Sequence, residues 1–263
     1  MTAVVRISLS SLQNVMRSRW AIVYALFFFI LTQGLFHVMG QSAKVILSLV
    51  NITLFLVPLI SAVFATMYFY NSREFVELLL TQPLRRVSVF IGLFAGLTLS
   101  LATGFIVGVG LPFIINGISS AHQLASVVTL LITGTALTWI FVALGFVVSV
   151  VIPDKGKGLG VTLLVWLVLA LVYDGLILAG VHAFGDYPLE KPVLAAVMAN
   201  PIDLARVLLL TQIDAAALMG YTGAVFRRFF GGELGLIISG ASLITWSTLP
   251  VLLGLWRFRR RDF

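Results

Sequence analysis

Tyr70–Arg86 reads YNSREFVELLLTQPLRR, and this stretch decides how the rest of the chain is interpreted. It is the only place in the first half where charge is dense between two long apolar runs. Asn71 is suited to cap a helix, and Glu74 three residues later completes a capping-box pattern. Pro83 cannot continue the hydrogen-bond ladder of a helix. We therefore expect a short helix over residues 71–82.

The apolar side chains of this expected helix fall on one face. Phe75, Leu78 and Leu79 follow the helical period, so they can contact either the rest of the chain or a groove in a partner. Glu74 and Glu77 project nearby. The pattern alone leaves two interpretations open, an ordinary structured loop and a helix that docks to a soluble partner.

The composition indicates an integral membrane protein. The chain has 263 residues, of which 60% are hydrophobic and 10% charged, with a mean hydropathy of +1.10. A soluble domain carries about 25% charged residues. The length suits one compact transmembrane domain over residues 1–263. The absence of cysteine excludes disulfides, thiolate metal sites and cysteine catalysis.

Six apolar runs predict an all-α protein with six membrane-spanning helices. The expected spans cover roughly residues 20–36, 45–70, 88–115, 124–152, 159–181 and 234–255. The longest polar segment, residues 182–233, separates the last two. Residues 4–19 precede the first span and have an amphipathic pattern, which favours a helix lying in the membrane interface over a simple extension of that span. This N-terminus lacks the features of a cleavable signal peptide.

The net charge of +7 is distributed unevenly between the two sides of the expected bundle. The N-terminal segment, the 71–87 loop, the 153–158 turn and the C-terminal tail share one side and carry twelve Lys and Arg residues, against five on the other side. Positive residues concentrate on the cytoplasmic side of membrane proteins. Both termini and the 71–86 stretch are therefore expected in the cytoplasm, and residues 182–233 outside. This placement explains the basic residues better than binding to nucleic acid does.

Asp174 is the one ionisable residue deep inside an expected span. A carboxylate in lipid is costly, so Asp174 should face the bundle or a water-filled path. It could lie on a translocation route or form a mechanical polar link, or it could make a structural hydrogen bond to a neighbouring helix. Asn51 and Thr138 are possible partners.

The external segment contains a strong helix start. Asn200 precedes Pro201 at the first helical position, and Asp203 lies two residues further on. We expect a helix of about a dozen residues there. Its apolar face should comprise Ile202, Ala205, Leu208 and Leu209. Two roles stay open for it, a surface that docks an outer partner and a re-entrant helix that plugs the outer face of the bundle.

No metal site or nucleotide site is predicted in this chain. The histidines at 37, 122 and 182 are not paired at metal-ligand spacing. The glycines at 156, 158 and 160 imitate part of a phosphate loop but lack the preceding strand. With no Walker motif, any ATP must be hydrolysed by a separate chain. Two other classes of membrane protein are disfavoured. A membrane-embedded enzyme would need clustered ionisable residues, and a secondary transporter would need more charge within the membrane and two related halves. The sequence shows neither pattern.

The central stretch resembles the segment that follows the second span in ABC-2 type permeases, the membrane subunits of one class of ATP-driven transporters. Glu77–Arg86, ELLLTQPLRR, matches the second half of that segment, whereas Glu74-Phe75 replace its usual Gly-Thr. The resemblance includes the amphipathic N-terminus, the six spans, the external insertion and the basic tail. The chain is most similar to permeases that serve nitrous oxide reductase maturation. The motifs that carry this similarity are LLLTxPL from Leu78, LVYD from Leu171 and NPIDLxR from Asn200. A general ABC-2 exporter permease for a lipid, drug or other hydrophobic cargo is the alternative.

The resemblance implies a non-enzymatic subunit of the bacterial inner membrane that pairs as a homodimer above a dimer of cytoplasmic ATPases, which bind ATP and Mg. It also implies a periplasmic β-helix partner and a copper chaperone lipoprotein. The residues expected to couple to the ATPase are Asn71, Arg73, Glu74, Phe75, Glu77, Leu78, Arg85 and Arg86. Those expected to dock an external partner are Asp203, Arg206, Arg227 and Arg228.

Overall fold

The computed structural model describes residues 19–260 except 82–84, 119, 185–189 and 213–232, and within these residues every regular element is helical. The expected interfacial helix over residues 4–19 lies outside the described residues apart from Arg19, where α2 begins. The elements are α2 (Arg19–Met39), α3 (Ser42–Asn71), α4 (Arg73–Leu80), α5 (Arg86–Asn116), α6 (Ala121–Val151), α7 (Lys155–Leu167), η1 (Val168–Val172), α8 (Tyr173–Ala183), α9 (Glu190–Met198), α10 (Pro201–Gln212) and α12 (Glu233–Arg259).

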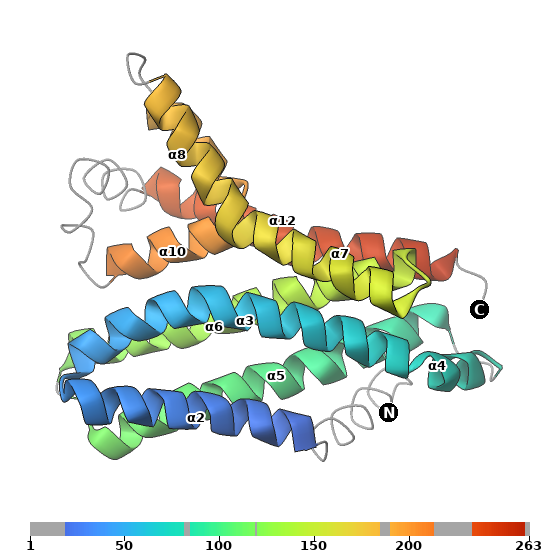
Figure 1. The fold of residues 1–263 in the computed structure, drawn as a ribbon, viewed down its shortest axis with the longest axis horizontal. Helices are drawn as coiled ribbons and strands as arrows, with labels where there is room; N and C mark the ends of the chain where they lie inside the picture. The colour runs from blue at the N-terminus through green and yellow to red at the C-terminus, as the bar shows by residue number, and fades with distance from the viewer. Residues whose placement is uncertain (1–18, 82–84, 119, 185–189, 213–232, 261–263) are drawn as a thin grey trace.

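The long helices lie side by side in a bundle whose centre is the pair α3 and α6 (Figure 1). α2 packs on α5, α12 packs on α6 and α5, and α7 packs on α3. Close approach depends on small residues, because a Cβ on Gly145 of α6 would lie 2.7 Å from the Ala62 carbonyl oxygen of α3. The core is rich in aromatic residues, and the Phe258 ring centroid lies 6.2 Å from that of Phe69 and 5.4 Å from that of Phe90.

Among the residues that the structure describes, five helices are long and apolar enough to cross a membrane, namely Ile22–Met39, Ser42–Asn71, Arg86–Asn116, Ala121–Val151 and Lys155–Ala183. They coincide with the first five expected spans. The expected sixth, from Leu234 to Leu255, falls within α12 beside α6. A further pair, Pro192–Met198 with Pro201–Leu210, is bent by 106° and has the form of a broken span or a re-entrant loop. The structure therefore has five to six apolar helices that could span a membrane.

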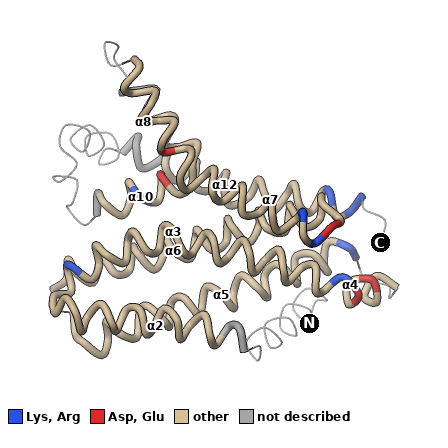
Figure 2. The backbone as a smooth tube through the Cα atoms, viewed as in Figure 1, with Lys and Arg blue, Asp and Glu red and all other residues tan. Residues whose placement is uncertain are grey.

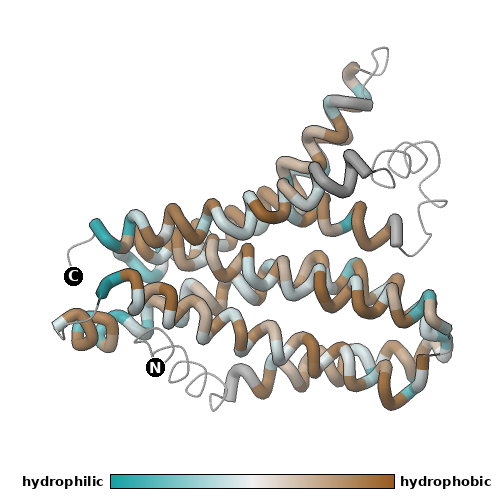
Figure 3. Tube along the Cα trace, turned by 180° about the vertical axis from the view of Figure 1, so that it is seen from behind, coloured by the Kyte–Doolittle hydropathy of each residue, from teal (hydrophilic) through white to brown (hydrophobic). Residues whose placement is uncertain are grey.

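Most of the described Lys and Arg residues gather at one end of the bundle, where α4, the start of α7 and the end of α12 meet, whereas others lie on α3 and α10 (Figure 2). The same end holds Glu74 and Glu77 of α4 and Asp154 before α7. We call it the charged end. This distribution is the one that the residue count predicts, because the loops with excess positive charge lie together. The long helices between the two ends are predominantly hydrophobic (Figure 3).

The fifth span changes direction at η1. Its first part, α7, lies along α3, whereas α8 diverges from the bundle (Figure 1). η1 is a π-helical turn, in which the backbone bonds link residues five apart and one extra residue occupies the turn. Only 11% of an 18-residue apolar window within this span is buried, so its apolar side chains need lipid or another protein to cover them.

Candidate functional site

α4 is a short amphipathic helix at the charged end, and its bounds differ from those expected. It covers Arg73–Leu80 instead of 71–82. Asn71 is the last residue of α3, and its side-chain oxygen accepts a hydrogen bond from Lys155 Nζ at 3.0 Å. The predicted capping box is therefore wrong, because Ser72 occupies the N-cap position and makes no side-chain cap bond. Glu74 lies in the first turn, where a negative charge favours the helix dipole.

One side of α4 contacts the bundle and the other faces outward. Val76 is fully buried, while Leu79 and Leu80 pack partly on the core. The exposed residues are Glu74, Phe75, Glu77 and Leu78. Two of these are large apolar side chains, since Leu78 is 66% exposed and Phe75 44% exposed. The sequence left open whether Phe75 and Leu78 contact the rest of the chain or a partner. In the structure both side chains are exposed, so both are available to a partner.

Arg73 links α4 to the connection between α6 and α7. Its Nη1 donates to the Pro153 carbonyl oxygen at 2.7 Å, and its Nη2 donates to the Ile152 carbonyl oxygen at 3.4 Å. The guanidinium also lies 4.8 Å from the centroid of the Tyr70 ring. Tyr70 in turn donates its hydroxyl to the Ile152 carbonyl oxygen at 2.9 Å. One planar cation therefore contacts three residues in two parts of the chain, which a point charge could not do.

The start of α7 packs closely against α3. Asp154 caps α7, because its side-chain oxygen accepts from the Lys157 backbone N–H at 2.7 Å. Gly158 lies directly beneath the Tyr70 ring, where any Cβ would overlap the hydroxyl. Further along, the hydroxyls of Thr66 and Thr162 share a buried hydrogen bond of 2.8 Å. Polar and packing contacts therefore join this end of α3 to the start of α7.

The two arginines after the expected helix lie at the same end. Arg85 is the exposed N-cap residue of α5 and makes no side-chain cap bond. Arg86 begins α5 and donates from Nη1 to the Arg259 carbonyl oxygen at 3.1 Å, at the end of α12. Arg86 therefore joins the charged ends of α5 and α12. Its hydrogen bond to α12 was not foreseen, because 173 positions separate the two residues.

A second polar cluster lies where α8 meets α10. Asp174 pairs with Arg206, whose Nη1 lies 2.7 Å from the Asp174 carboxylate and 3.0 Å from the Asp203 carboxylate. The suggested partners of Asp174 are wrong. Asn51 is exposed on α3, and Thr138 donates its hydroxyl to the Gly134 carbonyl of its own helix at 2.8 Å. The carboxylate within the fifth span is therefore paired with a cation, as the cost of burying a charge in lipid requires.

Asn200 caps α10 as predicted and also contacts the π turn. Its side-chain oxygen accepts from the Ile202 backbone N–H at 3.1 Å. Its side-chain amide donates to the Leu169 carbonyl oxygen of η1 at 2.7 Å and to Asp203 at 2.9 Å. A π turn disturbs the regular backbone ladder, so an outside donor to its carbonyl oxygen stabilises it. Next to the turn, Tyr173 donates its hydroxyl to the Ala196 carbonyl of α9 at 2.8 Å.

α10 packs into the bundle. Three of the expected face residues, Ile202, Ala205 and Leu209, are buried in the main core, and α10 contacts α6 and α3. Asp203 is only 4% exposed, and its docking to an external partner stays a prediction. Arg206 is engaged with the two carboxylates. Arg227 and Arg228 lie outside the described residues, so docking by them stays a prediction.

The described residues contain no group of three or more metal-ligating His, Cys, Asp or Glu side chains. The three histidines lie on separate helices, His37 in α2, His122 in α6 and His182 in α8. The arrangement offers ion pairing and mechanical linkage, and the residues at the charged end are suited to contact a soluble protein.

The sequence matches known transporter subunits along its whole length. The family described as ABC-2 family transporter protein matches residues 6–263. A probable ABC transporter permease protein NosY from Stutzerimonas stutzeri is 28% identical over 290 residues, and a second from Pseudomonas aeruginosa is 25% identical over 277 residues. Each alignment covers 99% of both chains. The similarity therefore includes both polar clusters.

Proposed function

The chain belongs to the ABC-2 family of transporter proteins, as a multi-pass permease subunit, and we propose that α4 transmits the work of a separate cytoplasmic ATPase to its membrane helices. The observation that carries the proposal is Arg73, which bonds the first turn of α4 to the α6–α7 connection. The outward residues of α4 would contact the ATPase, which would hold ATP and Mg.

The contacts of α4 give a route for that work. α4 follows α3 after a single residue, Ser72, so a force on α4 acts directly on the end of α3. Arg73 carries the same displacement to the start of α7, and Val76 keeps α4 seated on the core. α3 and α7 would then move together, which is the kind of rigid-body shift that ATP-driven closure can drive.

The two named relatives support a role in nitrous oxide reductase maturation. In this proposal the chain has six spans with α12 as the last, and it forms a homodimer. It resides in the bacterial inner membrane with both termini in the cytoplasm, in agreement with the charge asymmetry. A periplasmic β-helix protein and a copper chaperone lipoprotein would be the outer partners. Asp174 would serve as a mechanical link between α8 and α10.

Co-purification from native membranes followed by mass spectrometry tests the proposal. The wild-type chain should retain an ATP-hydrolysing protein, and Glu74→Ala/Glu77→Ala/Leu78→Ala should release most of it while the permease stays in the membrane. Lys157→Ala is the control, because that exposed side chain lies at the same end but outside α4. Recovery of no ATPase with the wild type, or equal recovery with the triple variant, would contradict the role given to α4. Recovery of nitrous oxide reductase maturation proteins would separately support the proposed branch.

A further inference from the structure

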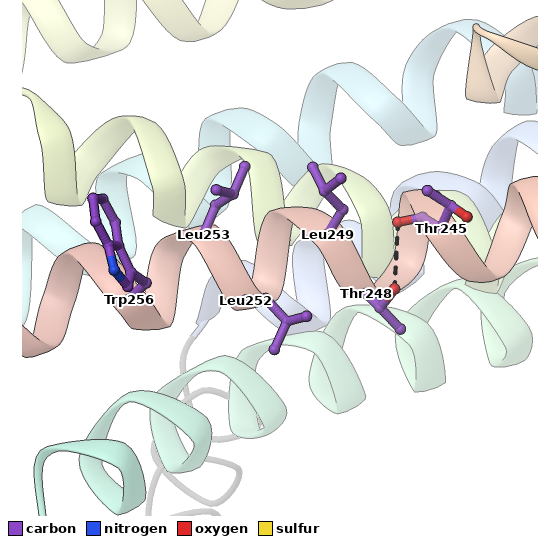
Figure 4. A pocket seen from close by; sticks show the side chains of 6 residues that line it. All are labelled: Thr245, Thr248, Leu249, Leu252, Leu253 and Trp256. Carbon is purple, nitrogen blue, oxygen red and sulfur yellow. Dashed lines mark hydrogen bonds between the residues drawn. The ribbon is translucent and has the colours of Figure 1, made fainter.

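The exposed side of α12 carries an apolar groove that the proposed coupling does not use. Its volume is about 510 Å³, and its described lining comes from α12 alone (Figure 4). The lining residues are Thr245, Thr248, Leu249, Leu252, Leu253 and Trp256. Leu252 is 62% exposed, so the groove opens to the surroundings of the bundle.

The two threonines do not make the groove polar. Thr245 donates its hydroxyl to the Ala241 carbonyl oxygen at 2.8 Å, and Thr248 donates to the Ile244 carbonyl oxygen at 2.8 Å. Both hydroxyls are satisfied within the helix and need no partner in the groove. The remaining lining is leucine and tryptophan, which suits a hydrocarbon chain.

One end of the groove is strongly basic. Trp256 is followed by Arg257, Arg259 and Arg260, and the Arg260 guanidinium lies 4.4 Å from the centroid of the Trp256 ring. Within the described residues, no carboxylate forms an ion pair with these three arginines. A basic cluster at the end of a membrane helix attracts anionic lipid headgroups. Tryptophan is also enriched at the depth of the headgroups.

The length of the groove matches one leaflet of a bilayer. Thr245 and Trp256 are eleven positions apart, which is about 16 Å along a helix. Half of a hydrocarbon core of about 30 Å is about 15 Å. A helix from a second copy would continue through both leaflets. A groove confined to one leaflet, with positive charge at the headgroup level, fits a lipid better.

We propose that α12 binds an anionic phospholipid of the leaflet that adjoins the charged end. One acyl chain lies along the groove between Thr245 and Trp256, and the headgroup phosphate pairs with Arg257 and Arg260. The proposal rests on membrane embedding and is independent of any ATPase, so it can fail while the proposed function stands.

A fluorescence experiment on the full chain tests the site. The sequence has no cysteine, so Leu252→Cys can be labelled with a single fluorophore. The labelled protein is placed in phosphatidylcholine nanodiscs that contain a minor fraction of either brominated phosphatidylglycerol or brominated phosphatidylcholine. We expect the brominated phosphatidylglycerol to quench more strongly, with an apparent affinity roughly tenfold higher. Leu164→Cys on α7 is the matched control, since Leu164 is 60% exposed and lies on another helix.

Charge-removing variants distinguish a lipid bound at α12 from a general attraction of anionic lipids to the charged end. Arg257→Gln/Arg260→Gln should abolish the preference for phosphatidylglycerol, whereas Arg257→Lys/Arg260→Lys should keep most of it and show that the fold tolerates change there. Arg85→Gln/Lys157→Gln removes the same charge from the same end and should have no effect. The proposal is overturned if both lipids quench equally, or if the control pair abolishes the preference. It is also overturned if Leu252→Cys chains cross-link to one another in the membrane, which would place a second copy in the groove.

Discussion

Arg206 of α10 holds Asp174 of α8 at 2.7 Å, and this pair joins the bent α9–α10 segment to the outer part of the fifth span. The same guanidinium nitrogen contacts Asp203 at 3.0 Å. In the described residues α8 has no buried side chain, so it has little packing of its own to hold it against the bundle. Its position therefore depends on polar contacts, and the predictions below begin with them.

The Asp174–Arg206 pair should show a measurable coupling energy. The two side chains are 37% and 31% exposed, and polar contacts between membrane helices contribute modestly, so we expect about 1 kcal/mol. A double-mutant cycle with Asp174→Asn and Arg206→Gln, read from the unfolding midpoint of the purified protein, measures it. Strictly additive effects of the two changes would mean that the pair contributes nothing. Asn51→Ala is the control, because the exposed Asn51 should not couple to Arg206.

Asn200→Ala should destabilise both the start of α10 and the π turn η1. The variant loses the cap of α10 and the donor to the Leu169 carbonyl oxygen, which together should cost about 2 kcal/mol. Hydrogen exchange should increase at residues 168–174 as well as at the start of α10. Asn200→Ser keeps a cap acceptor but loses the amide donor, so its effect should concentrate at the π turn. An increase confined to α10 in both variants would show that Asn200 does not support η1.

Arg73→Lys should behave almost like Arg73→Ala in coupling. A lysine cannot donate to two carbonyl oxygens and cover the Tyr70 ring at once, because its ammonium is a compact point charge. With the co-purified ATPase in proteoliposomes, we expect both variants to lower permease-stimulated ATP hydrolysis severalfold while leaving the amount of complex unchanged. Full activity of Arg73→Lys would show that only the charge of Arg73 matters.

Gly158→Ala should destabilise the packing of α7 on α3. A methyl group there would overlap the Tyr70 ring, and overpacking of this kind costs about 1–3 kcal/mol. The effect should shrink in a Tyr70→Ala background, where the space is free. Gly160→Ala is the control, since nothing lies within 4 Å of a Cβ at Gly160. Equal destabilisation by both alanines, measured by thermal unfolding, would point to helix flexibility instead of the ring contact.

The features that sequence predicted well are those fixed by local rules. Long apolar runs identified the first five spans, and the Asn200-Pro201 start of α10 followed from capping chemistry. The capping box at Asn71 failed because α3 continues to that residue, and its side chain bonds to Lys155 across 84 positions. A tertiary contact outcompeted a local signal there.

The pairing of Asp174 with Arg206 was missed for a related reason. Residue counting assigned Arg206 to an external loop, whereas the bend between α9 and α10 returns it to the bundle. Nothing in the local pattern of residues 168–172 marks a π turn. Without that turn, the side of the span on which Asp174 lies could not be inferred.

The π turn makes this pairing depend on how the backbone of the span is wound. One additional residue in a helical turn rotates everything after it by about 100° relative to an uninterrupted α-helix. Asp174 lies immediately beyond η1. Replacing the π turn by regular α-helix at unchanged length would therefore turn the carboxylate away from Arg206, whereas deleting one residue within 168–172 along with the π turn would leave it in place. In this transporter, the meeting of the two charges is set by backbone winding as much as by chemistry.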